Sequence, residues 1–264
     1  MRIDNKTTDT PLESPPVSNG VTWKPWLAVI FIILIYYASQ VFGSLVALII
    51  PTLRHWTTAQ ASAWLQSSII GQFVFVAAAE AFTLGALYWY LRKHHASFSV
   101  IGLLRPRWRD LGYGLLAAPL YYGVYLFTVK LATHFVPAFN VTQTQEIGFN
   151  NVNGVAPLIL TFISLVILPP ITEEILVRGF LYSSLKKGLP TIAAVIVTSA
   201  IFASAHLPEG GAAGPLYIAA LDTFILSLVL IGLRERTGSL WAGITLHTIK
   251  NGVAFVALFI LHVH

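Results

Sequence analysis

The chain of 264 residues is 56% hydrophobic and only 10% charged, and its mean hydropathy is +0.72. A soluble domain carries about 25% charged residues, so this composition excludes an ordinary soluble fold and indicates a polytopic membrane protein. The net charge is +5, but the basic residues lie between apolar runs, so we expect them to set membrane orientation and expect no nucleic-acid partner. The absence of cysteine excludes a disulfide framework, a thiolate metal site and a cysteine nucleophile.

Apolar segments follow one another along most of the chain. Residues 1–23 are polar and carry three prolines, so they predict a disordered cytoplasmic tail. The first apolar run is too long for a signal peptide and should anchor the chain. Each apolar segment reaches the roughly 20 residues that a membrane-spanning helix requires. Seven are expected, at 26–50, 67–91, 111–134, 155–186, 189–207, 215–233 and 239–262.

These segments predict an all-α, polytopic integral membrane bundle of about seven transmembrane helices. Helices are the expected form because unpaired backbone groups cannot face lipid. The fourth segment is overlong and contains Pro169-Pro170, which removes two amide donors, so we expect that segment to be broken there.

Basic residues are concentrated in alternate connections, and among the other connections only Arg54 appears. They lie between the second and third segments, the fourth and fifth, and the sixth and seventh: Arg92, Lys93, Arg105, Arg107, Arg109, Lys186, Lys187, Arg234 and Arg236. By the positive-inside rule we expect a multi-pass protein of the plasma membrane, with a cytoplasmic amino terminus and the carboxyl terminus outside.

Residues 94–110 mix apolar side chains with arginines and are expected to lie in the membrane interface. We accordingly expect a tail at 1–23, amino-terminal transmembrane helices with this interfacial segment at 24–153, and a catalytic transmembrane core at 154–264.

Four polar residues in three of these spans fall at a similar depth. Counted along a helix from the basic ends, Glu173, His206, His247 and Asn251 lie about 16 to 22 Å into the membrane. Charged groups at that depth are costly and mark functional sites or structural pairs. Three helices of alternating direction would thus bring a carboxylate, two imidazoles and an amide to one level.

Helical spacing separates the roles of the remaining residues. Glu174 and Arg178 are four residues apart and should form a buried pair. Glu173 is rotated by about 100° from Glu174 and is free for chemistry. Gly243, one turn before His247, should let another backbone approach that helix face. Lys250 and Asp222 are a further candidate pair.

This set of side chains favours hydrolysis of a peptide bond in or near the membrane. A carboxylate beside an imidazole can hold and deprotonate a water molecule. An opposing imidazole and an amide can donate to the oxyanion of a tetrahedral intermediate, a contribution of about 3 kcal/mol per donor.

Three ordered motifs carry a resemblance to a known family. They are Glu173-Glu174-x-x-x-Arg178, Phe202-x-x-x-His206 and His247-x-x-x-Asn251. Residues 154–261 resemble the CPBP family of CAAX prenyl protease and bacteriocin-processing intramembrane endopeptidases, also called Abi. The resemblance implies that Glu173 is the base, His206 its partner on the water, and His247 with Asn251 the oxyanion donors, with Glu174 and Arg178 in support. Lys250 departs from it, because a small or apolar residue is expected there.

Several alternatives stay open at this point. The protein works either without a cofactor, which we favour, or with one divalent metal, possible zinc ligands being Glu173, His206 and His247. The expected partners are a peptide or protein substrate and the lipid bilayer. One rival function is an ion- or proton-coupled transporter, which the lack of internal repeats disfavours. Another is a non-catalytic immunity or assembly protein of the same family.

Overall fold

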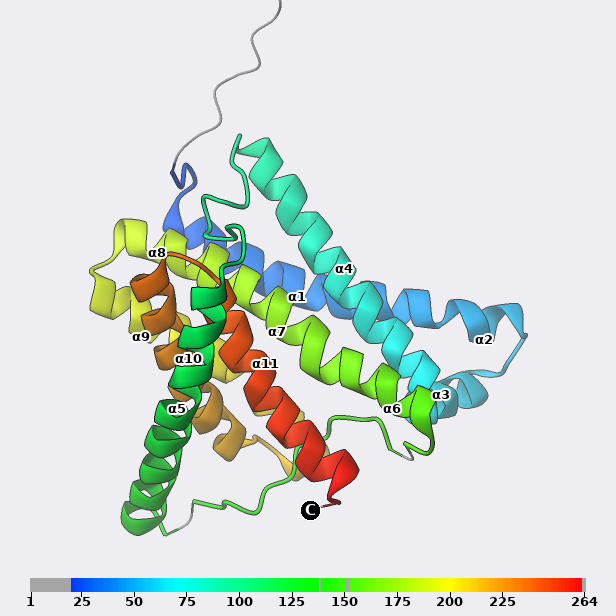
Figure 1. Ribbon diagram of the computed structural model, residues 1–264. Coiled ribbons are helices and arrows are strands. Elements are labelled where there is room, and N and C mark those ends of the chain that lie inside the picture. Colours follow the sequence, from blue (N-terminus) through cyan, green and yellow to red (C-terminus); the bar gives the residue numbers. More distant parts are fainter. Residues whose placement is uncertain (1–19, 138, 151, 263–264) are drawn as a thin grey trace, which may run out of the picture.

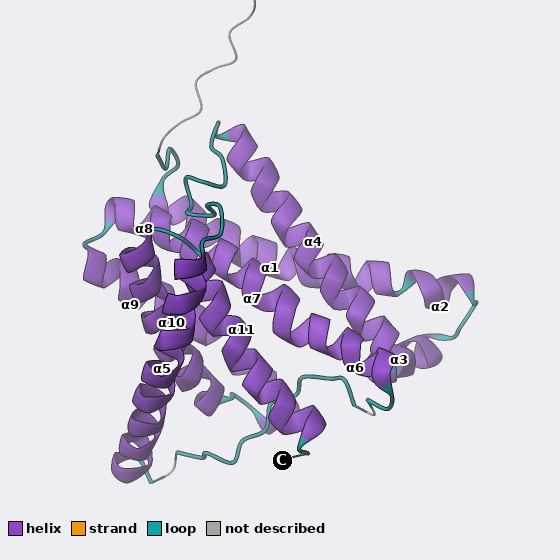
Figure 2. Ribbon diagram, in the orientation of Figure 1, coloured by secondary structure: helices purple, strands orange, loops and turns teal. Residues whose placement is uncertain are grey.

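The computed structural model describes residues 20–137, 139–150 and 152–262, and within these ranges it contains helices and no strand (Figure 2). Most of the predicted tail, 1–23, lies outside the described residues. The helices, in chain order, are α1 (Pro25–Ala47), α2 (Ile49–Leu53), α3 (Thr58–Ser67), α4 (Ile69–Lys93), α5 (Trp108–Phe135), α6 (Val155–Phe162), η1 (Ile163–Ile167), α7 (Leu168–Glu173), η2 (Glu174–Leu181), α8 (Tyr182–Gly188), α9 (Thr191–Ala205), η3 (Leu207–Ala213), α10 (Tyr217–Thr237), α11 (Trp241–Phe255) and η4 (Val256–Ile260).

Seven helical segments of the described residues are long and apolar enough to cross a membrane, and each overlaps one predicted span. They are Pro25–Leu53, Ile69–Lys93, Trp108–Phe135, Val155–Gly188, Thr191–Ala213, Tyr217–Thr237 and Trp241–Ile260. The prediction of an all-α polytopic bundle is therefore confirmed. The short helix α3 was not predicted; Thr57 caps it by a reciprocal bond with Gln60, the pattern of a capping box.

The fourth span lies at the centre of the bundle (Figure 1). Its segments α6 to α8 contact α1, α4, α9, α10 and α11, whereas α5 packs on α10 and α11. One apolar cluster surrounds η2 and α8, and a second fills the space between α5, α10 and α11. Side chains on the fourth span are thus surrounded by helices from both halves of the chain.

The expected break in the fourth span is not present; the span is continuous, and its helical hydrogen bonding is altered around the two prolines. The span is one helical run of 34 residues, Val155–Gly188, in which the π-helical segments η1 and η2 flank α7. Pro169 and Pro170 follow η1 directly, so the amides that they lack would have bonded to carbonyls of the preceding turn. Glu173 ends α7 and Glu174 begins η2, so both carboxylates lie where the helix changes its pitch.

The connection between α4 and α5 is docked on the helix ends. Its Ile101 is fully buried, and the carbonyl of Gly102 accepts a hydrogen bond from the Leu240 amide at 3.0 Å. The indole of Trp241 donates to the carbonyl of Leu104 at 2.6 Å. These bonds hold part of the predicted interfacial segment against the start of α11.

Candidate active site

The four polar residues predicted to share a depth all line one cavity. Its volume is about 240 Å³, and Glu173, His206, His247 and Asn251 contribute to its wall. They come from α7, the end of α9 and α11. A space of this size holds several water molecules, each of which occupies about 30 Å³ in the liquid.

Two carboxylates contact the His247 ring from opposite sides. Its Nδ1 lies 3.2 Å from Glu174 Oε1, and its Nε2 lies 3.8 Å from Glu173 Oε2. Because an ionised carboxylate can only accept, Nδ1 carries the hydrogen that bonds to Glu174. In the neutral ring Nε2 is then an acceptor facing Glu173, and it becomes a donor only in the imidazolium.

The predicted pair of Glu174 and Arg178 is present and buried. Arg178 Nη1 lies 3.0 Å from Glu174 Oε1, with side-chain exposures of 0% and 1%. The Arg178 guanidinium also stacks on Phe202, with its Cζ 4.1 Å from the ring centroid. The second oxygen of Glu174 fills the space that Gly243 leaves open, since a Cβ there would lie 2.8 Å from Oε2. Gly243 therefore admits a carboxylate, where we had expected a backbone.

His206 has a different carboxylate partner from the expected one. Its Nδ1 lies 2.9 Å from the Phe202 carbonyl, which accepts the Nδ1 hydrogen, so Nε2 of the neutral ring is an acceptor. That Nε2 lies 3.9 Å from Glu209 Oε1. His206 and Glu173 line the same cavity, but the direct carboxylate neighbour of His206 is Glu209. A link from His206 to Glu173 would have to pass through water.

Asn251 is fixed by the fourth span. Its Nδ2 donates to the Leu165 carbonyl at 2.9 Å. The amide has a second hydrogen on Nδ2, and Asn251 also borders the cavity. One hydrogen of the amide thus orients the side chain and the other is available to a bound group.

The segment that contains these residues is similar to a known protein family. Residues 155–253 match the family model described as "Type II CAAX prenyl endopeptidase Rce1-like". This segment is Rce1-like. The match extends from the start of α6 to two residues beyond Asn251, so it includes all three motifs. The resemblance to the CPBP family is confirmed, and its members are CAAX-protease-like intramembrane endopeptidases. No match was found among curated proteins or among solved structures.

The Rce1-like segment carries a second ion pair in the cavity wall. Lys250 Nζ lies 3.0 Å from Asp222 Oδ2, which confirms the candidate pair. The hydroxyl of Tyr121, on α5, donates to the other oxygen of Asp222. Lys250, the residue that departs from the family pattern, is thus neutralised by Asp222, and Tyr121 of α5 holds Asp222 in place.

The candidate metal ligands Glu173, His206 and His247 do not form a ligand cluster in the described residues. In the described parts of the chain, no three side chains of His, Cys, Asp or Glu are grouped so that they could hold a metal ion. Of the three candidate ligands, His206 is directed to Glu209 and the Phe202 carbonyl, while His247 lies between Glu173 and Glu174.

Sequence reasoning missed the residues that close the cavity on one side. Glu209 lies three residues after His206, a helical spacing that could have drawn attention to it. Gln145 donates from Nε2 to Glu209 Oε2 at 2.7 Å, and the Glu146 amide donates to the Glu209 carbonyl at 2.8 Å. Gln145 and Ile147 also line the cavity. They belong to an irregular connection without periodicity, so no sequence pattern indicates their position.

Proposed function

We propose that the Rce1-like segment hydrolyses peptide bonds with a water molecule activated by Glu173. The observation that carries this proposal is the cavity itself. A carboxylate with 30% side-chain exposure lies 3.8 Å from an imidazole nitrogen, in a space large enough for water and lined by a second imidazole and an amide. Such a carboxylate can accept a proton from water in contact with it.

In the proposed reaction, Glu173 removes a proton from the water, and the resulting hydroxide attacks the carbonyl carbon of the scissile bond. The carbonyl electron pair moves to oxygen and gives a tetrahedral oxyanion. When this intermediate collapses, the C–N bond breaks and Glu173 returns its proton to the leaving nitrogen. The products are a carboxylic acid and an amine, which give a carboxylate and an ammonium ion when the acid proton passes to the amine, and Glu173 is again ionised.

His206 has the hydrogen-bonding pattern required to hold this water. Its Nδ1 hydrogen is engaged by the Phe202 carbonyl, so its Nε2 presents a lone pair. A water that donates one hydrogen to this nitrogen keeps its other hydrogen for Glu173.

Asn251 and His247 are the proposed oxyanion donors. Asn251 offers the Nδ2 hydrogen that Leu165 does not use. His247 can offer an Nε2 hydrogen only as an imidazolium, because Nδ1 already donates to Glu174. Glu174 and Arg178 therefore support the reaction by fixing the orientation and charge of His247.

We further propose that the protein lies in the plasma membrane with the basic connections in the cytoplasm. The seven spans and the alternation of basic connections support this orientation. The proposed partners are a peptide or protein substrate and the bilayer.

To test this proposal, the purified protein is incubated in detergent with a peptide library, with and without a divalent-metal chelator, and the cleavage of the peptides is measured. We expect internal peptide bonds to be cleaved and the rate to be unaffected by the chelator. Loss of cleavage on chelation would show that a metal is required. Absence of cleavage, together with ion flux in reconstituted vesicles, would instead support the transporter.

A further inference from the structure

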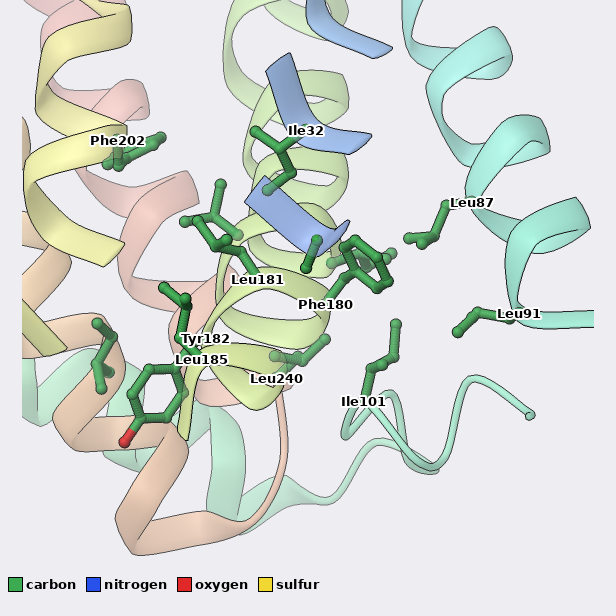
Figure 3. Packing of buried hydrophobic residues seen from close by; sticks show 14 of the residues in the cluster. Ile32, Leu87, Leu91, Ile101, Phe180, Leu181, Tyr182, Leu185, Phe202 and Leu240 are labelled. Atoms are coloured by element: carbon green, nitrogen blue, oxygen red, sulfur yellow. The ribbon is translucent and has the colours of Figure 1, made fainter. Parts of the chain in front are cut away.

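The cavity is closed toward the basic connections. On that side of Glu173 lie the buried side chains of Glu174 and Arg178, followed by a packed apolar cluster. Figure 3 shows Phe180, Leu181 and Leu240 of this cluster gathered between helices and close to Ile101 of the α4–α5 connection. Phe180 and Leu181 have no exposed surface. A peptide cannot pass through this layer to Glu173.

On the opposite side the cavity continues into a groove. The groove has a volume of about 620 Å³ and shares Gln145, Ile147, Leu258 and Phe259 with the cavity wall. One side is formed by the connection between α5 and α6, and the other by the last turns of the seventh span. Figure 1 shows that connection at the lower end of the bundle, whereas the α4–α5 connection lies at the upper end. The open end of the site is therefore far from the basic connections.

The groove wall combines amide groups with apolar side chains. Residues 142–149 form an irregular segment with no helical hydrogen bonds, and Thr144 and Asn150 border the groove as exposed residues. Leu258 and Phe259 add apolar surface. An extended peptide presents backbone donors and acceptors between its side chains and matches such a wall. A prenyl chain would leave these polar groups without partners.

We propose that the substrate peptide reaches Glu173 from the face opposite the basic connections, lying extended in the groove between residues 143–150 and the end of the seventh span. This inference rests on the proposed function. With the proposed orientation, the substrate is an extracytoplasmic peptide segment and not the cytoplasmic tail of a prenylated protein.

The chain has no cysteine, so single cysteines can mark its two faces. Thr144→Cys lies at the groove, and Ser183→Cys lies on α8 beside Lys186 and Lys187. Labelling of these two variants with a membrane-impermeant maleimide defines which face is outside in sealed vesicles, independently of the positive-inside rule. A peptide cleaved by the purified protein is then added outside vesicles of each orientation.

We expect cleavage only where the Thr144→Cys face is outside, and we expect bound peptide to protect Thr144→Cys from labelling. A bulky Thr144→Trp should raise KM about tenfold at unchanged kcat, while Thr133→Trp, on an exposed face of α5, should not. Cleavage restricted to vesicles with the Ser183→Cys face outside would overturn the inference and leave the proposed hydrolysis intact. Absence of cleavage by the purified protein in detergent would overturn both.

Discussion

The side-chain amide of Asn251 donates to the main-chain carbonyl of Leu165 at 2.9 Å. In an α-helix that carbonyl would accept from the amide of residue 169, and in a π-helix from residue 170. Both positions are proline and have no amide hydrogen. The two prolines thus remove two donors from the fourth span, and the Leu165 carbonyl that they leave without an amide accepts instead from Asn251 of the seventh span.

Replacing Pro169 should release Asn251. In Pro169→Ala the new amide can donate to Leu165 and compete with Asn251, so we expect peptide cleavage to fall while the stability holds or increases, since alanine favours a helix interior over proline by about 3 kcal/mol. Cleavage rates and chemical denaturation in detergent measure the two effects. Pro119→Ala, in the interior of α5, is the matched control and should leave cleavage unchanged. Equal activity of the Pro169→Ala variant would contradict the proposed role of Asn251.

The buried pair of Glu174 and Arg178 supports both folding and the site. Arg178→Met leaves the Glu174 carboxylate buried without its guanidinium partner, and we expect a loss of about 3–5 kcal/mol in the free energy of unfolding. Glu174→Leu combined with Arg178→Met should recover most of that stability but not the cleavage activity, because His247 Nδ1 then has no acceptor. Denaturation and cleavage assays on the same preparations separate the effects. A double variant as active as the parent would show that His247 needs no carboxylate.

Gly243 offers a test of the space around Glu174. In Gly243→Ala the added Cβ would lie 2.8 Å from Glu174 Oε2, and that carboxylate is held by Arg178 and His247. We expect a loss of about 1–3 kcal/mol in the free energy of unfolding and a lower cleavage rate. Gly252→Ala, on the same helix, is the control. Its Cβ would meet Val166 at an ordinary 3.7 Å, so it should be neutral or slightly stabilising. Similar behaviour of the two variants would contradict the packing described.

The contribution of the Lys250–Asp222 ion pair to stability can be tested by reversing its charges. Either Lys250→Asp or Asp222→Lys replaces this 3.0 Å ion pair by two like charges in a mostly buried setting, and we expect a loss of about 1–3 kcal/mol in stability. The double variant, with the charges exchanged, should recover much of it in a denaturation assay. Lys130→Met, at an exposed position on α5, should change stability by less than about 0.5 kcal/mol. Failure of the exchange to restore stability would mean that the contact contributes little.

Much of the fold could be predicted because the bilayer imposes a strong rule. Apolar runs of sufficient length must be helices, and all seven spans were located in this way. The pair of Glu174 and Arg178 was also predictable, since side chains four residues apart on a helix are neighbours. The proximity of Glu173 and His247 could be predicted because both residues lie at a similar depth in the membrane when residues are counted along their helices.

The remaining contacts depend on tertiary packing, which periodicity does not encode. The spacing of His206 and Glu209 allowed a contact but did not indicate that Glu209 would lie nearer to His206 than Glu173 does. No pattern indicated that Gln145 would bind Glu209 from a distant connection. The sequence also did not predict how the helix accommodates Pro169-Pro170, because a missing amide can lead to a kink, a chain break or a π-helical segment. Here the π-helical form keeps the span continuous.

The central claim is that Glu173 is the base that activates water. Its most direct test is the rate of peptide cleavage by Glu173→Gln, which keeps the size of the side chain and removes its ability to take a proton. Glu235→Gln, whose partner Lys186 lies on the basic side, is the matched control. We predict that Glu173→Gln folds, still binds the peptide and loses cleavage entirely, while Glu235→Gln cleaves at the parent rate. Cleavage by Glu173→Gln at the parent rate would contradict the claim.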